Sequence, residues 1–164
     1  MSEFEAVLPA LDLSTPLLAL ASAALLGFLV GIVPVGLAEV LAVAIGAVEP
    51  PGLAVGMLAL FTLTHVAAKA LWYWIGVHAD RIRHERTRQF IARARVFLAE
   101  HPGFGLGVLG SSAVLSVPPF HLAAIAAGLV RIPFGRFVAT CLAGRAIRFG
   151  VLGGAVTLIR HLLG

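Results

Sequence analysis

The residues of this sequence that are best suited to chemistry are a few polar side chains set in long apolar stretches. Glu39 stands alone in one such stretch. In two others, His65 precedes Lys69 by four positions and Arg145 precedes Arg148 by three. Residues three or four apart share one face of a helix. A carboxylate at membrane depth costs about 2.5–3.5 kcal/mol on insertion scales, so Glu39 is expected to be protonated, paired or hydrated.

These polar residues carry more positive than negative charge. If Glu39 pairs with one of Lys69, Arg145 and Arg148, an excess near +2 remains, and a bound anion would offset it. Arginine suits bidentate phosphate contacts, and helix N-termini add backbone donors. We therefore predict that Arg145, Arg148, Lys69 and His121 bind a phosphate-bearing substrate. A structural ion pair, or side chains that extend to the membrane surface, is the alternative.

Two of the residues could link binding to protons. Glu39 and His65 are predicted as the proton-coupling pair, with a packing role for His65 as the alternative. His121 follows Pro118-Pro119, which removes two backbone donors and leaves carbonyl groups without helical partners. A hydrogen-bond donor role toward those carbonyls is as reasonable for His121 as a functional one.

Enzyme chemistry has no comparable pattern here. The sequence contains no HExxH motif and no nucleophile elbow. We therefore predict no catalytic residue, no metal site, no cofactor and no enzymatic activity. Half of the twelve Lys and Arg residues lie within residues 78–101, which is typical of a cytoplasmic loop of a membrane protein. These six are Arg81, Arg83, Arg86, Arg88, Arg93 and Arg95. A patch that binds nucleic acid or lipid headgroups is the alternative.

The overall composition indicates an integral membrane protein. Hydrophobic residues make up 60% of the 164 residues and charged residues 12%. The mean hydropathy is +1.01. The N-terminal residues before Thr15 contain acids but no Lys or Arg, unlike the basic start of a signal peptide. We expect the first apolar segment to stay in the protein.

Two segments are long enough to cross a bilayer as single helices, which requires about 20 apolar residues. They are residues 53–77 and 137–161. Two other apolar segments, 13–48 and 104–130, are interrupted by Pro34 and by Pro118-Pro119. Each piece of the second is too short to cross, so both segments are predicted as re-entrant helical hairpins.

The order hairpin, span, basic loop, hairpin, span predicts a single membrane domain over residues 1–164 that is built from two inverted repeats. A short echo supports a repeat, because GAVEPP at 46–51 resembles GLVRIP at 128–133. With the basic loop in the cytoplasm, the two hairpins enter from opposite sides. The predicted fold class is therefore all-α and polytopic.

Three segments carry a resemblance to a known family. GIVPVGLAEVLAVAIGA (31–47), VPPFHLAAIAAGLVRIPFGRF (117–137) and GRAIRFG (144–150) resemble the DedA/VTT (SNARE-associated) membrane proteins, especially the small YqaA-like members. The resemblance implies paired re-entrant hairpins, a multi-pass location in the bacterial inner membrane, and a role in membrane homeostasis. Members of the family are associated with lipid movement between leaflets, in some cases thought to be proton-coupled.

We therefore predict a protein that moves an anionic lipid, such as a phospholipid or a polyprenyl phosphate, between leaflets. Its partners would be membrane lipids, with no nucleic acid. A non-transporting scaffold and a small-solute or drug exporter are the alternatives. The glycine-rich spans suit a homo-oligomer as readily as a bundle within one chain.

Overall fold

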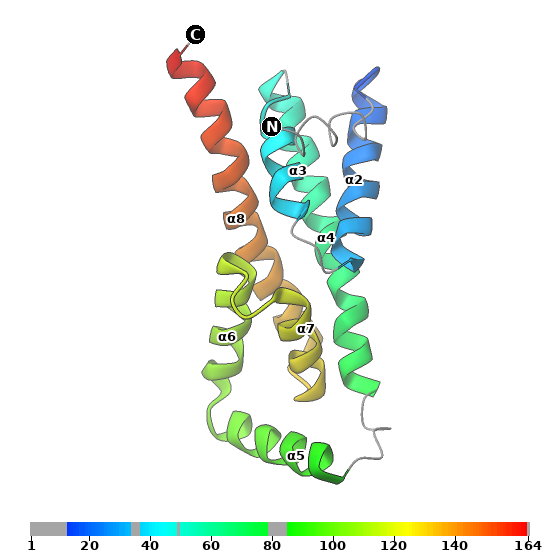
Figure 1. Cartoon of the computed structure of the whole chain (residues 1–164), viewed down its shortest axis with the longest axis vertical. Helices are drawn as coiled ribbons and strands as arrows, with labels where there is room; N and C mark the ends of the chain where they lie inside the picture. The colour runs from blue at the N-terminus through cyan, green and yellow to red at the C-terminus, as the bar shows by residue number, and fades with distance from the viewer. Residues whose placement is uncertain (1–12, 34–36, 49, 79–84, 164) are drawn as a thin grey trace. The chain divides into compact units, whose positions relative to one another are not determined.

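All regular secondary structure of the described residues is α-helical. The computed structural model describes residues 13–33, 37–48, 50–78 and 85–163, and all regular elements within these ranges are α-helices (Figure 1). They are α2 (Pro16–Ile32), α3 (Leu37–Gly46), α4 (Pro51–His78), α5 (Glu85–Glu100), α6 (Pro102–Leu115), α7 (Phe120–Leu129) and α8 (Phe134–Leu163). The predicted all-α class is confirmed for this part of the chain.

Two of these helices, α4 and α8, contain the segments predicted to cross a bilayer. α4 has 28 residues and α8 has 30. At 1.5 Å per residue they are about 42 and 45 Å long, more than the roughly 30 Å of a hydrocarbon core. Both are apolar enough to span a membrane by composition. The existence of two helices that could span a membrane is therefore confirmed.

The first apolar segment forms two separate helices, α2 and α3, as the predicted interruption at Pro34 requires. α2 ends at Ile32, and the backbone N–H of Val33 still donates to Leu29 O at 3.2 Å. α3 then begins at Leu37. Pro34, the residue predicted to cause the break, lies outside the described residues. The two helices have 17 and 10 residues, so neither reaches the length of a full crossing.

A second break separates α6 from α7 at Pro118-Pro119, as predicted. Ser116 closes α6 in the left-handed conformation, with φ of 59°, and its N–H donates to Ser112 O at 2.8 Å. The Val117–Pro118 peptide bond is cis. α7 begins at Phe120. These helices have 14 and 10 residues, again shorter than a full crossing.

The segment predicted as a basic loop, 78–101, contains the helix α5. Ile91 is buried on this helix, whereas Arg93 is exposed. Hydrophobic and charged side chains on separate faces give α5 an amphipathic character that a loop would not need. Figure 1 shows α5 running across the direction of α6 and α7. Arg81 and Arg83 lie outside the described residues.

The chain forms two compact units, and the boundary falls inside both long helices. Unit 1 comprises residues 1–68 and 145–164, and unit 2 comprises residues 69–144. Unit 1 therefore contains α2, α3, the first part of α4 and the second part of α8. Unit 2 contains α5, α6, α7, the last part of α4 and the first part of α8.

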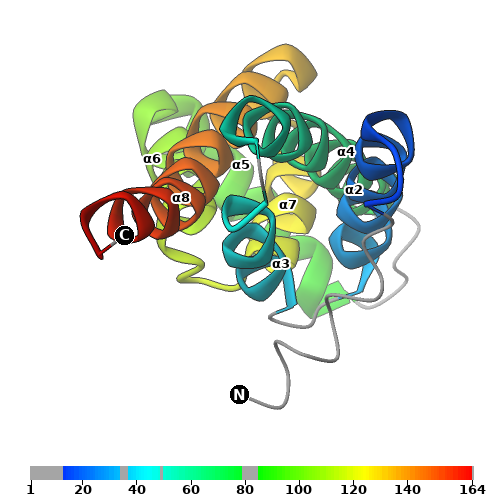
Figure 2. The same cartoon turned by 90° about the horizontal axis from the view of Figure 1, so that it is seen from above.

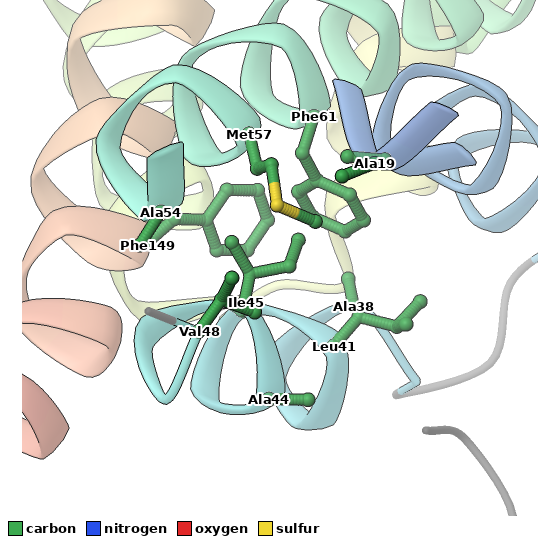
Figure 3. Packing of buried hydrophobic residues seen from close by; sticks show 12 residues of the cluster. Ala19, Ala38, Leu41, Ala44, Ile45, Val48, Ala54, Met57, Phe61 and Phe149 are labelled. Atoms are coloured by element: carbon green, nitrogen blue, oxygen red, sulfur yellow. The ribbon is translucent and has the colours of Figure 1, made fainter. Parts of the chain in front are cut away.

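Unit 1 has an apolar core between α3, α4 and α8. Ile45, Met57, Phe61 and Phe149 are fully buried, and Figure 3 shows their side chains gathered together. α2 lies beside α4 (Figures 1 and 2). A Cβ at Gly27 would lie 2.5 Å from Phe61 O, so this helix pair needs a residue without a side chain there.

Unit 2 is held together by close helix contacts and by aromatic packing. A Cβ at Gly128 of α7 would collide with the Tyr73 carbonyl of α4. Tyr73 itself packs on Phe137, with ring centroids 4.7 Å apart, and its hydroxyl donates to Ile132 O at 2.7 Å. Tyr73 is therefore buried and belongs to the interior of unit 2, whereas Trp74 next to it is 47% exposed.

The helix bounds show a regular spacing along the chain. α2 and α6 end at residues 32 and 115, and α3 and α7 begin at residues 37 and 120 and end at 46 and 129. α4 and α8 begin at residues 51 and 134. The two residue numbers of each pair differ by 83.

Candidate functional site

Glu39 lies in the first turn of α3, just after the break that follows α2. The N-terminal end of a helix carries partial positive charge, so a carboxylate is favoured at this position. The Glu39 side chain is 27% exposed, which leaves it partly accessible. The break between α2 and α3 therefore delivers an acid to the start of a short apolar helix.

Two arginines of α8 converge on this acid within unit 1. The Arg148 Nε donates to Glu39 Oε1 at 3.0 Å, and Arg145 Nη1 lies 3.5 Å from the same oxygen. Arg145 and Arg148 are three residues apart, so both side chains leave one face of α8. Pairing was one of the three states expected of Glu39 from the sequence, and in the structure it contacts two cations.

The three side chains of this cluster include two cations and one acid. Arginine stays protonated at all ordinary pH values, so the two guanidinium groups carry +2. One ionised carboxylate leaves the cluster with a net charge of +1. The Arg145 side chain is only 5% exposed, and burial of a charge is costly unless an opposite charge compensates it. The Glu39 carboxylate supplies such a charge beside the buried guanidinium group of Arg145.

Phe149 connects the cluster to the buried histidine. The Arg145 guanidinium lies 5.4 Å from the Phe149 ring centroid, a distance typical of a cation–π contact. The His65 ring packs edge-on against the Phe149 ring, and the two ring centroids are 5.5 Å apart. His65 is 2% exposed. Phe149 follows Arg145 by four positions, a spacing that places both on one face of a helix. Phe149 was not among the predicted site residues, because only polar side chains were considered for them.

The other two predicted substrate-binding residues belong to unit 2. Lys69 is 4% exposed, and its Nζ lies 5.8 Å from the Phe120 ring centroid. The His121 ring is 6.0 Å from the Trp72 ring. Arg145 and Arg148 belong to unit 1, so the four residues are divided between the two units.

The hydrogen-bond role expected of His121 falls to a serine. Ser112 Oγ donates to the carbonyl of Pro118 at 2.6 Å, across the break between α6 and α7. Ser112 is fully buried, so this bond satisfies a carbonyl where water is excluded. Pro118 and Pro119 lie between α6 and α7, and the Pro118 carbonyl accepts its hydrogen bond from Ser112.

Metal binding has no support in the described part of the chain. Its residues contain no group of three or more His, Cys, Asp or Glu side chains that could hold a metal ion. Cys141, the single cysteine of the sequence, is buried in α8.

Comparison of the chain with family models, with curated proteins and with solved structures found no match.

Proposed function

We propose that this protein is a multi-pass protein of the bacterial inner membrane, of DedA/VTT type, and that it moves an anionic lipid between leaflets. The observation that carries the proposal is the cluster of Glu39, Arg145 and Arg148. Its two guanidinium groups belong to an apolar helix that is long enough to cross a bilayer. Guanidinium groups bind a phosphate-bearing headgroup well, through paired charge-assisted hydrogen bonds.

The depth of the cluster supports this reading. Arg145 and Arg148 occupy positions 12 and 15 of the 30 residues of α8, near its middle. A charged residue at that depth is rarely tolerated without a function or a partner. Glu39 begins the second helix of a broken pair, so an α2–α3 hairpin that turns back at mid-depth brings it to the same level.

The repeat of 83 residues supports the proposed inverted architecture. In unit 1, α2 packs on α4 through Gly27, and α3 packs on α8 through Gly46. In unit 2, α6 packs on α8 through Gly144, and α7 packs on α4 through Gly128. Exchanging α2, α3 and α4 for α6, α7 and α8 converts one set of contacts into the other. Two re-entrant hairpins of opposite orientation explain this exchange.

The geometry also suggests how a proton could enter the cycle. Glu39 and an incoming phosphate compete for the same two guanidinium groups. Protonation of Glu39 removes its negative charge and leaves Arg148 and Arg145 to the phosphate. Loss of the proton restores the ion pair and expels the headgroup. His65, in contact with Phe149, is the second predicted participant in this transfer.

Lipid flipping in proteoliposomes tests the function. Fluorescent phosphatidylglycerol in the inner leaflet is exposed to a membrane-impermeant quencher as it moves outward. We expect Arg145→Ala/Arg148→Ala to reduce the rate at least about tenfold, whereas Arg93→Ala on the exposed face of α5 leaves it unchanged. Equal rates in both variants would remove the arginines from the mechanism. Purified wild-type protein that moves no lipid would favour the scaffold or exporter alternatives.

The topology has a separate test, because the chain contains a single cysteine. Cys141→Ala provides a background for single-cysteine labelling with an impermeant maleimide. Ser14→Cys and Pro50→Cys flank the α2–α3 pair, and Gly103→Cys and Arg131→Cys lie near the ends of the α6–α7 pair. Re-entrant hairpins predict that both members of a pair label from the same side and that the two pairs label from opposite sides. Labelling of Ser14→Cys and Pro50→Cys from opposite sides would contradict the hairpin.

A further inference from the structure

Unit 2 contains a cavity of about 200 Å³ that is lined by three arginines. Arg95 comes from α5, Arg131 from the connection between α7 and α8, and Arg136 from the first turn of α8. None of the described residues that line it is acidic. Three guanidinium groups around one hollow create a local field that attracts an anion. This cavity is formed by residues other than the predicted site residues.

The backbone holds Arg131 in an unusual conformation. Arg131 has φ of 58°, in the left-handed region. Its N–H donates to Gly128 O and that of Ile132 to Ala127 O, each at 3.0 Å, which is the Schellman pattern that ends a helix. Glycine is the usual residue at this position, and any other residue pays roughly 1 kcal/mol in backbone strain. The strain indicates that the side chain of Arg131 is needed where it lies.

Arg95 is also fixed in position. Its Nε donates to Leu129 O at 2.8 Å, so a carbonyl near the end of α7 orients the guanidinium group. A guanidinium group is a rigid planar fork whose geometry suits two oxygens of one phosphate. The three arginines of the cavity are therefore positioned differently. A hydrogen bond orients the Arg95 guanidinium group, the end of α7 fixes the backbone of Arg131, and Arg136 lies in the first turn of α8.

An apolar cavity adjoins the basic one. It has a volume of about 110 Å³, and the described residues that line it are all apolar or glycine. Leu98, Gly105, Val130 and Ile132 line both cavities. A single binding site therefore presents guanidinium groups at one end and hydrocarbon at the other.

We propose that these adjoining cavities bind an anionic lipid. Its phosphate lies on Arg131 and Arg136 with Arg95 beside it, and the first methylene groups of an acyl chain enter the apolar cavity. Basic pockets among membrane helices are suited to anionic headgroups, and the apolar extension selects a lipid over free phosphate. The inference rests on the membrane location of the proposed function but not on lipid movement.

Native mass spectrometry of the protein purified in a non-ionic detergent tests the site. The full-length protein is incubated with phosphatidylglycerol or with phosphatidylcholine, and the retained lipid is counted. We expect retention of phosphatidylglycerol, at least about fivefold reduced in Arg131→Gln/Arg136→Gln and unchanged in Arg93→Gln. Arg93 is an exposed arginine of α5 that does not line the cavity. Equal losses in both variants would show a general charge effect and overturn the site.

Two further variants separate binding from folding. Arg131→Gly is expected to keep or raise the thermal stability, since it relieves the left-handed strain, while phosphatidylglycerol retention falls. Stability and retention that fall together would assign Arg131 a purely structural role. Ala126→Phe fills the apolar cavity and is expected to reduce retention, whereas Ala139→Phe, on the exposed surface of α8, is not.

Free anion is the competing ligand. Inorganic phosphate at millimolar concentration is expected to displace little phosphatidylglycerol. Full displacement, together with no effect of Ala126→Phe, would show an anion site without a place for a chain and overturn the lipid assignment. Retention by Arg145→Ala/Arg148→Ala separates the two proposals. Arg145 and Arg148 do not line these cavities, so this variant is expected to keep its phosphatidylglycerol while it flips less. Wild-type protein that retains phosphatidylglycerol but flips none would refute the proposed function and leave this inference standing.

Discussion

The start of α3 in unit 1 and the start of α7 in unit 2 differ sharply in chemistry. Each follows a break in a helix pair, and each packs on the long helix that follows the other pair. The first turn of α3 provides Glu39, which pairs with Arg148 and Arg145. The first turn of α7 provides rings, since Phe120 lies under Lys69 and His121 lies beside Trp72.

The two regions share a close helix crossing at a glycine. A Cβ at Gly46 of α3 would collide with the Gly153 backbone of α8, and one at Gly128 of α7 would collide with the Tyr73 carbonyl of α4. Small residues allow the helices to approach this closely. In both units the helix crossings depend on glycine, whereas the polar contacts beside them differ from one unit to the other.

The largest expected effect comes from breaking the ion pair of unit 1. Glu39→Ala leaves the buried Arg145 without its carboxylate, and we expect it to destabilise the protein by about 3 kcal/mol. His121→Ala at the start of α7 removes only a ring contact and is expected to cost less than about 1 kcal/mol. Reversible unfolding in mixed micelles measures both free energies.

A double-mutant cycle sharpens this difference. Arg148→Gln should cost less in a Glu39→Gln background than in the wild type, because the pair has already been lost. A coupling energy near zero would contradict the ion pair. Equal costs of Glu39→Ala and His121→Ala would contradict the chemical difference between the two units.

The second expected effect tests what the two regions share. Gly46→Ala and Gly128→Ala each place a methyl group against backbone, and we expect a cost of about 2–3 kcal/mol in both cases. Gly150→Ala is the control, since a Cβ there meets nothing within 4 Å. Alanine is the better helix former, so the control should be neutral or stabilising. Thermal unfolding in detergent ranks the three variants, and a clear inequality between Gly46→Ala and Gly128→Ala would break the correspondence.

Much of the helical framework was predictable because it depends on local sequence. Proline removes donors wherever it stands, so the break at Pro118-Pro119 follows from two residues. The two long helices follow in the same way from uninterrupted apolar composition. The helix α5 was missed because its arginines were interpreted as a solvated loop, although Ile91 and Leu98, seven residues apart, share an apolar side.

The contacts of the candidate site depend on tertiary structure and were predicted only in outline. From the sequence, Glu39 could be protonated, paired or hydrated, and nothing in it chose among Lys69, Arg145 and Arg148 as the partner. That choice depends on α3 packing against α8, which Gly46 and Gly153 make possible. A donor role at this break was considered for the neighbouring His121, whereas the donor in the structure is Ser112, which reaches the Pro118 carbonyl from six residues earlier.

The third expected effect concerns the two hydrogen bonds that close unit 2. Ser112→Ala removes the donor to Pro118 O, and Tyr73→Phe removes the donor to Ile132 O. Each leaves a carbonyl without that donor, so a loss of about 1 kcal/mol is expected in either variant. Ser111→Ala is the matched control, because Ser111 is exposed and donates only to its own helix at Val108 O. If Ser111→Ala costs as much as Ser112→Ala, the bond across the break has no special importance.

The smallest expected effect lies at the entry to the two helix pairs. Thr15 caps α2, its Oγ1 accepting from the Leu18 N–H at 3.2 Å, whereas His101 at the start of α6 makes no side-chain cap bond. Thr15→Val keeps the shape but loses the acceptor, so we expect a loss of about 0.5–1 kcal/mol, while Thr15→Ser retains the cap and most of the stability. Hydrogen exchange of the first turn of α2 is the most direct measurement, because fraying there precedes global unfolding. Protection that is equal in Thr15→Val and Thr15→Ser would mean that α2, like α6, begins without help from a side-chain cap, and the difference between the two pairs would then be confined to Glu39 and its arginines.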